Sequence, residues 1–153
     1  MILRPVEQAD IPWMAAIRAQ GGTAAFWKDR IGLYLSGQHS PQQALTARAA
    51  FVAIDRNDLV GFVAGHRTRG LNCDGELQWI NVVKERRGLG VASQLMTKIS
   101  TWFVDQDARR ICVNVDPNNS AARKLYTRHG AQPLNDHWMV WEDARAMSIS
   151  ADV

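Results

Sequence analysis

The chain has 153 residues, of which 46% are hydrophobic and 22% are charged, a size and balance typical of one globular domain with its own core. The formal net charge is only +3, and the basic residues are dispersed, so the composition gives no argument for a nucleic-acid partner. No apolar run reaches the roughly 20 residues of a membrane span, and the first residues lack a signal-peptide pattern. We therefore expect a cytoplasmic protein with no membrane partner.

The first part of the chain predicts one strand and then helices. The strand covers residues 2–6, and a helix follows it from about Pro12 to the glycine pair 21–22. Residues 24–35 carry apolar side chains at helical spacing and predict a second helix. A third, short helix is expected over residues 40–47.

The middle of the chain predicts antiparallel strands. Residues 51–54 and 59–65 read as two strands, joined by a hairpin turn at 55–58. A loop over residues 70–75 then leads into a third strand, expected over 76–83. The hairpin requires antiparallel pairing in this part of the sheet.

The last part predicts helices alternating with strands. Helices are expected from about residue 90 to 104 and over 119–129, and strands over 110–115 and 137–141. This order predicts an α/β protein with a mixed sheet and helices on both faces. We place the single domain at residues 1–143 and a C-terminal tail at 144–153.

The cysteines and histidines show no metal-binding pattern. Cys73 and Cys112 are far apart, and the four histidines are scattered, so no metal is expected. Cys112 lies in an apolar strand-like run and is expected to be a reduced core residue rather than part of a disulfide.

A basic turn with two glycines joins the strand at 76–83 to the helix that follows. It reads Arg87-Gly88-Leu89-Gly90-Val91-Ala92. The glycines carry no Cβ that would keep a ligand off the backbone. The first amides of a helix have no intrahelical partner and lie at the positive end of its dipole. The turn therefore predicts a site for a phosphate or pyrophosphate.

This turn resembles the acyl-CoA-binding loop of the GCN5-related N-acetyltransferase (GNAT) family. The family signature is Gln or Arg, two residues, Gly, one residue, and then Gly or Ala, and residues 87–92 match it in full. A second segment is similar to the family's next conserved region, with Asn119, Ala122, Leu125 and Tyr126 at the family's spacing. The family fold has the same order of elements, so the resemblance covers nearly the whole chain.

The resemblance implies acetyl-CoA as co-substrate, no metal, and direct attack of a primary amine on the thioester. The cofactor would lie against Arg87, Gly88, Leu89, Gly90, Val91 and Ala92 through its pyrophosphate. Asn119 would contact the pantetheine arm, and Val82 would offer its amide and carbonyl to the same arm. The family carries a bulge in the strand before the loop, which we expect at residues 80–83, where a backbone amide would polarise the acyl oxygen.

Two residues are candidates for the proton transfers. The resemblance places Tyr126 near the thioester sulfur, where a neutral phenol can protonate the leaving thiolate. Glu76 lies where many family members carry the carboxylate that serves as base. Tyr126 could instead be a core aromatic, and Glu76 a solvated carboxylate at a strand edge. Asp116 and His137 are the next candidates for the base.

Two other functions remain open at this stage. A nucleotide-binding oxidoreductase would explain the first two glycines, but Ser93 stands at the third glycine position of a dinucleotide fingerprint. A non-catalytic acyl-CoA-binding sensor or interaction module would need the cofactor site but not Tyr126.

The acceptor is expected to be a small molecule or peptide amine. Aromatic residues such as Trp27, Tyr34 and Trp138 would border its pocket. A homodimer is left open.

Overall fold

The computed structural model describes residues 1–150, which form one seven-stranded mixed sheet with helices on both faces. The strands are β1 (Ile2–Pro5), β2 (Ala44–Asp55), β3 (Asp58–Thr68), β4 (Gly75–Val82), β5 (Ile111–Asn114), β6 (Gln132–Asn135) and β7 (Trp138–Trp141). The α-helices are α1 (Ile11–Ala19), α2 (Ala24–Leu35), α3 (Val91–Asp105) and α4 (Ser120–Arg128). Four 3-10 turns complete the chain: η1 (Gln8–Asp10), η2 (Gly70–Asn72), η3 (Lys84–Arg86) and η4 (Ala144–Ser148).

The sheet order is β1-β2-β3-β4-β5-β7-β6. Neighbouring strands are antiparallel except for β4 and β5, which are parallel because α3 carries the chain from one to the other. The parallel pair is short, since its register covers only residues 75–77 of β4. Beyond Leu77 the two strands separate, and the edge of β4 that faces β5 has no strand partner.

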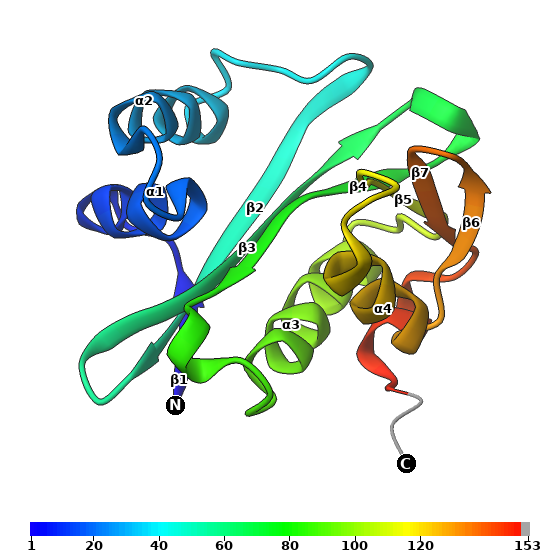
Figure 1. Cartoon of the computed structure of the whole chain (residues 1–153). Coiled ribbons are helices and arrows are strands. Elements are labelled where there is room, and N and C mark those ends of the chain that lie inside the picture. The colour runs from blue at the N-terminus through cyan, green and yellow to red at the C-terminus, as the bar shows by residue number, and fades with distance from the viewer. Residues whose placement is uncertain (151–153) are drawn as a thin grey trace.

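Two hydrophobic clusters fill the opposite faces of the sheet. Helices α1 and α2 bury Met14, Ile31 and Tyr34 against one face. Helix α3 buries Leu95 and Ile99, among others, against the opposite face. Figure 1 shows α1 and α2 on one side of the long β2–β3 hairpin and α3 on the other. The predicted α/β class with helices on both faces is therefore confirmed.

Residues 40–47 do not form the expected helix. Strand β2 already begins at Ala44, which pairs with Thr68 of β3. The guanidinium of Arg48 binds the carbonyl oxygens of Tyr34 and His39 at 2.8 and 3.1 Å, so it ties the start of β2 to the end of α2. Pairing with the long β3 outweighs the helix preference of this alanine-containing segment, since propensity is a weak prior against tertiary pairing.

The bulge in β4 also differs from its expected position at residues 80–83. Ala64 of β3 pairs with Trp79, whereas the next residue, Gly65, pairs with Leu77, so Gln78 is the extra residue. The bulge coincides with the point where β4 leaves β5. As a result the strand turns its edge away from β5 two residues earlier than the sequence predicted.

The first residues of the predicted tail pack into the core. In η4, Ala144 and Met147 are 1% and 0% exposed and belong to the cluster beneath α3. The boundary at residue 143 stays a prediction, but residues 144–148 contribute to the same core, and residues 151–153 lie outside the described part. Within residues 1–150, no helix is long and apolar enough to cross a bilayer.

Candidate active site

The glycine turn between β4 and α3 presents unbonded amides. Gly88 and Gly90 have φ angles of +79° and +85°, which side chains other than glycine rarely adopt, and a Cβ on either would meet open space. No hydrogen bond among the described residues uses the amides of residues 88–90, and the first turn of α3 adds further free amides. The turn therefore has the geometry of an anion site at a helix N-terminus.

The backbone of β4 leads from this turn along an open edge. The Val83 amide donates to the carbonyl of Val60 in β3 at 2.9 Å, so alternate residues of this part of β4 bond β3. Ile80 and Val82, between those residues, direct their amides and carbonyls toward the open edge. The Val82 carbonyl there accepts a bond from Nε of Arg87 at 3.2 Å, so the Val82 amide is the group that stays available.

Asn119 begins the helix on the far side of the opening. Its Oδ1 accepts from the Ala122 amide at 3.1 Å, so the side chain caps α4. Its exposed NH₂ group takes no part in that bond and can still donate.

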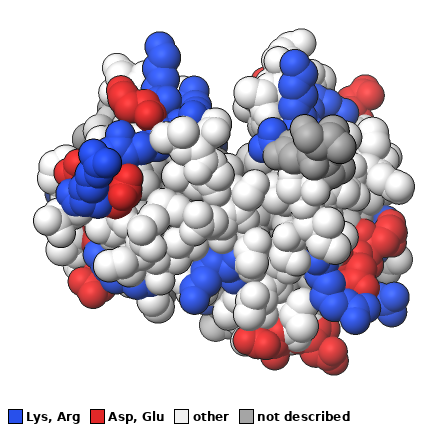
Figure 2. Space-filling view, turned by 90° about the horizontal axis from the view of Figure 1, so that it is seen from below, with Lys and Arg blue, Asp and Glu red and all other residues white. Residues whose placement is uncertain are grey.

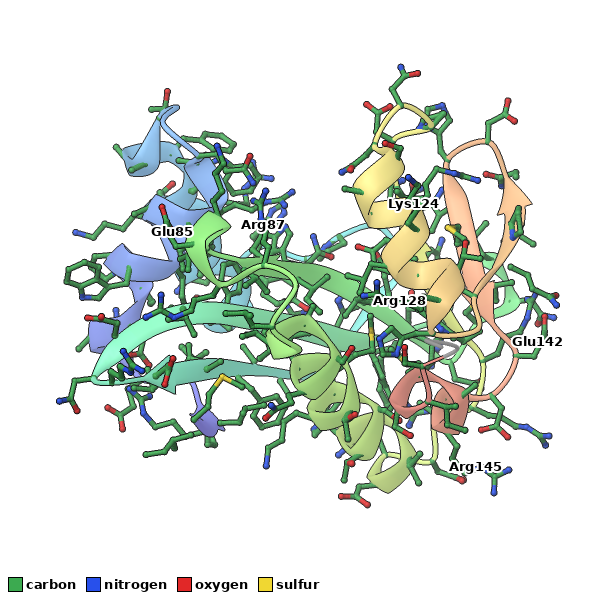
Figure 3. The ribbon with its side chains drawn as sticks, turned by 60° about the horizontal axis from the view of Figure 1, so that its bottom comes forward. Glu85, Arg87, Lys124, Arg128, Glu142 and Arg145 are labelled. Carbon is green, nitrogen blue, oxygen red and sulfur yellow. The ribbon has the colours of Figure 1, made fainter. Side chains whose placement is uncertain are left out.

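A notch on the molecular surface separates the part that carries α1 and α2 from the part that carries α4. Figure 2 shows this hollow with Lys and Arg side chains on both rims. In Figure 3, Arg87 lies on one side of it and Lys124 of α4 on the other. Both residues are exposed, so positive charge flanks the entrance to the open edge of β4. Lys124 was not among the predicted site residues.

Tyr126 is the buried residue of α4. The residue is 7% exposed, and its ring packs edge-on against Trp141, with the ring centroids 5.7 Å apart. No hydrogen bond of the described residues engages its hydroxyl group. Burial raises the pKa of Tyr126 to about 12, and the positive charge of Arg18 opposes that rise. The phenol is therefore protonated throughout the neutral range and available as a donor.

Glu76 lies on the α1–α2 face and is not the solvated carboxylate of the alternative interpretation. It is 8% exposed, and its Oε1 is 3.4 Å from Nε2 of His66, a fully buried residue of β3. On its other side, Nδ1 of His66 is 2.7 Å from the hydroxyl group of Tyr34. Three buried polar residues thus form a row that ends at Glu76.

This row has one favourable arrangement of protons while the imidazole is neutral. If His66 carried its proton on Nδ1, the lone pair of Nε2 would face the carboxylate and repel it. With the proton on Nε2, the ring directs an N–H toward Glu76 and accepts a hydrogen bond from Tyr34. His66 Nε2 lies near Glu76, but among the described residues it has no hydrogen-bond partner, so its contact with the carboxylate is electrostatic.

A cavity of about 580 Å³ opens beside Glu76 where β4 and β5 separate. Its lining brings together a carboxylate, a guanidinium, amides and two tryptophans: Arg18, Glu76, Gln78, Trp79, Asn114 and Trp138. Trp138 lines this cavity, whereas Tyr34 is fully buried in the core. Trp27 packs against Trp79 at 6.1 Å between ring centroids.

Arg18 is a site residue that the sequence analysis missed. It lies on α1, donates to Oδ1 of Asn81 at 3.3 Å and stacks over Trp27. Nothing near Arg18 in the sequence indicates a site, because its partners lie on α2 and β4. Only an unusually placed charge in the apolar pattern of α1 could have drawn attention to it.

The two other candidates for the general base, Asp116 and His137, lie in less suitable positions. Asp116 accepts a bond from the Asn118 amide at 2.8 Å and orders the turn before α4. His137 is exposed and does not border the cavity beside Glu76. Cys73 and Cys112 are buried free thiols, and no group of three or more His, Cys, Asp and Glu residues within 1–150 is arranged to hold a metal ion.

Comparison with known proteins agrees with this geometry. The sequence model of the Acetyltransferase (GNAT) family matches residues 22–131. A solved structure of an aminoglycoside antibiotic 6'-N-acetyltransferase from Acinetobacter haemolyticus superposes with a TM-score of 0.74 at 15% identity, over 88% of this chain and 93% of that one. The chain belongs to the GNAT acetyltransferase family, as the two sequence motifs predicted.

Curated relatives align over shorter segments. An L-2,4-diaminobutyric acid acetyltransferase of Methylotuvimicrobium alcaliphilum is 32% identical over 111 residues, which is 67% of this chain and 60% of that protein. N-alpha-acetyltransferase 30 of Schizosaccharomyces pombe is 30% identical over 83 residues, or 53% of this chain and 55% of that protein. The alignments thus span less than two thirds of these relatives.

Proposed function

We propose that this protein transfers an acetyl group from acetyl-CoA to a primary amine by direct attack on the thioester. The observation that supports the proposal best is the open edge of β4. One end of this edge runs into the turn with free amides at residues 88–90, and the other begins beside Glu76. An extended chain with amide groups, such as pantetheine, can pair with such an edge.

The anionic part of acetyl-CoA would bind at the glycine turn. Free amides of residues 88–90 and the N-terminus of α3 would receive the pyrophosphate, with Leu89, Val91 and Ala92 shaping the turn. The charge of Arg87 would favour the same anion. Asn119 would donate to the pantetheine arm from the opposite side, and the Val82 amide from β4.

The proton transfers would fall to Glu76 and Tyr126. The amine nitrogen attacks the thioester carbon, and a backbone amide of the open edge stabilises the oxygen that becomes negative. Glu76, directly or through water, accepts the proton that the amine must lose. As the carbon–sulfur bond breaks, the electron pair goes to sulfur, and the hydroxyl group of Tyr126 donates a hydrogen bond or a proton to the thiolate.

A thiol-release assay tests the function. The protein is incubated with acetyl-CoA and a panel of amines, and free CoA thiol is measured together with the mass of the acetylated product. We expect acceptor-dependent release and a gain of one acetyl group on the acceptor. Binding of acetyl-CoA without turnover of any amine would support the acyl-CoA sensor instead. Binding of NAD with no response to CoA would support the oxidoreductase.

The names of the similar proteins refer to acceptors of several kinds. Their names mention L-2,4-diaminobutyric acid, an N-alpha position and an aminoglycoside antibiotic. A small molecule or peptide amine is therefore our proposal for the acceptor class, with no metal involved. The cytoplasmic location, the lack of nucleic-acid and membrane partners, and a homodimer stay predictions.

A further inference from the structure

The cavity beside Glu76 holds one positive and one negative side chain. Arg18 reaches it from α1, and Glu76 from β4, while the remaining polar lining consists of amides such as Gln78 and Asn114. Among residues 1–150, these two are the only Asp, Glu, Lys or Arg side chains that line it, and the sequence separates them by 58 positions. A ligand that fills this cavity therefore meets opposite charges in one small space.

Arg18 is a partly buried cation without a carboxylate partner in the described chain. Its hydrogen-bond partner is the neutral amide of Asn81, and its Nε is buried with no partner at all. Burial lowers the pKa of Arg18, and no carboxylate among residues 1–150 offsets that effect. A guanidinium in this state is suited to a ligand carboxylate, whose two oxygens match its planar fork of donors.

Glu76 supplies the complementary charge. It is almost fully buried, its Oε1 lies 3.4 Å from Nε2 of His66, and it lines the cavity. The indole rings of Trp79 and Trp138 line the same space and can lie against a cationic amine. A second, unpaired acceptor lies nearby, because Oε1 of Gln78 is buried without a hydrogen-bond partner.

The geometry points to a small zwitterionic acceptor, an amino acid or a close analogue that carries a free amine and a carboxylate. Arg18 binds the carboxylate, and the amine lies between Glu76 and the open edge of β4. This inference rests on the proposed function and adds the chemical class of the acceptor. Arg18 would then determine the specificity for the acceptor.

The same charges disfavour the other acceptor classes. A polyamine or an aminoglycoside presents several cations, but the cavity offers one carboxylate and a guanidinium that repels them. The amino terminus of a protein has a neutral amide where a free amino acid has its carboxylate. Arg18 would then remain buried without a counter-charge in the complex.

The test compares acceptors that differ only in the carboxylate. The common L-amino acids and L-2,4-diaminobutyric acid are assayed for CoA thiol release, each beside its carboxamide. We expect at least one amino acid to be acetylated with kcat/KM roughly ten-fold or more above that of its carboxamide. In Arg18→Gln this preference should disappear, through a raised KM for the acid and little change for the carboxamide. Arg18→Lys, which keeps the charge, should retain part of it.

Further measurements distinguish a failure of this inference from a failure of the proposed function. Acetyl-CoA binding by calorimetry should be equal in wild type and both variants, and thermal unfolding checks that they fold. A carboxamide used as well as its acid would overturn the inference, as would a kcat reduced equally for both in Arg18→Gln. Turnover of amines or peptides but of no amino acid would also overturn it, while the proposed function would stand.

If no amine is acetylated, the proposed function fails and binding decides the inference. Calorimetry of the same acids and carboxamides in the presence of CoA then gives the answer. Binding of an acid in preference to its carboxamide, lost in Arg18→Gln, would support a zwitterion site. Equal binding, or none, would overturn it.

Discussion

At the scale of single residues, the environment of Tyr126 suits a proton donor at neutral pH. Burial raises the pKa of Tyr126 to about 12, above that of a free phenol, so it stays protonated wherever the enzyme would work. Full proton transfer to a thiolate is therefore less favourable than the usual phenol pKa suggests. A strong hydrogen bond from the neutral phenol to the sulfur would serve the same purpose.

Tyr126→Phe should lower kcat by roughly 10² or more, because a positioned acid contributes on that scale. The ring and its contact with Trp141 are kept, so affinity for acetyl-CoA and the unfolding temperature should change little. Because the pKa of Tyr126 is about 12, the wild-type rate should show no loss from its ionisation below about pH 11. A folded variant with the wild-type rate would leave Tyr126 a packing residue.

Glu76→Gln tests the proposed base. The amide keeps the size of the side chain but cannot accept the proton, so kcat should fall near neutral pH and recover as pH rises and free amine becomes available. The measurement is kcat against pH for both proteins with one acceptor. Asp116→Asn is the matched control, because Asp116 is exposed and bonds only the turn before α4. Superimposable profiles for wild type and Glu76→Gln would remove Glu76 from the mechanism.

At the scale of elements, the turn between β4 and α3 has two separate reasons to carry a glycine. Gly90 needs its φ of +85°, and it also leaves open space above the backbone. Gly37, which follows α2, has nearly the same φ of +81° and the same open space but lies outside the site. Comparing substitutions at Gly90 and Gly37 therefore separates the effect of backbone strain from the effect of blocking the proposed ligand site.

Gly90→Glu should weaken CoA binding by at least ten-fold, or about 1.4 kcal/mol, because it places a negative side chain at the proposed pyrophosphate position. Gly37→Glu should cost similar stability, as both force a side chain into the left-handed region, and leave CoA binding unchanged. Calorimetry with CoA and thermal unfolding are measured on both variants. Equal CoA affinity in a folded Gly90→Glu would place the cofactor elsewhere.

At the scale of the whole molecule, the C-terminal residues complete the core. Met147 is fully buried beneath α3, whereas Ile149, two residues later, is 67% exposed. Ser100 of α3 also donates to the carbonyl of Ala144 at 2.7 Å. The segment after the last strand thus supports the helix whose N-terminus forms the proposed phosphate site.

Met147→Ala should lower the free energy of unfolding by about 2–5 kcal/mol, the range for truncating a large core side chain. Ile149→Ala should change it by less than about 0.5 kcal/mol, as most exposed substitutions do. Denaturant unfolding gives both values. Equal stabilities would mean that the domain ends before η4, at the boundary of residue 143 that the sequence suggested.

The sequence alone was sufficient for the features that depend on short-range order. The strand–turn–helix around Gly88 and Gly90 and the spacing from Asn119 to Tyr126 indicated the family, because backbone geometry ties those residues together locally. Alternation and helical periodicity likewise predicted most elements. The start of β2 was missed because its pairing with the far end of β3 makes it a strand. The strand β6 was missed because its four exposed residues carry no apolar alternation, although it pairs with the neighbouring β7.

Only the tertiary structure decided what the pocket contains. Arg18 and Asn81 meet across 63 positions, and His66 faces Glu76 because β3 and β4 pair in one register. The bulge at Gln78 depends on where β4 leaves β5, which no local pattern records. Local rules act over a few residues, whereas the charges that would select an acceptor meet through packing between elements. The sequence therefore indicated the family, and the proposal for the acceptor rests on the fold.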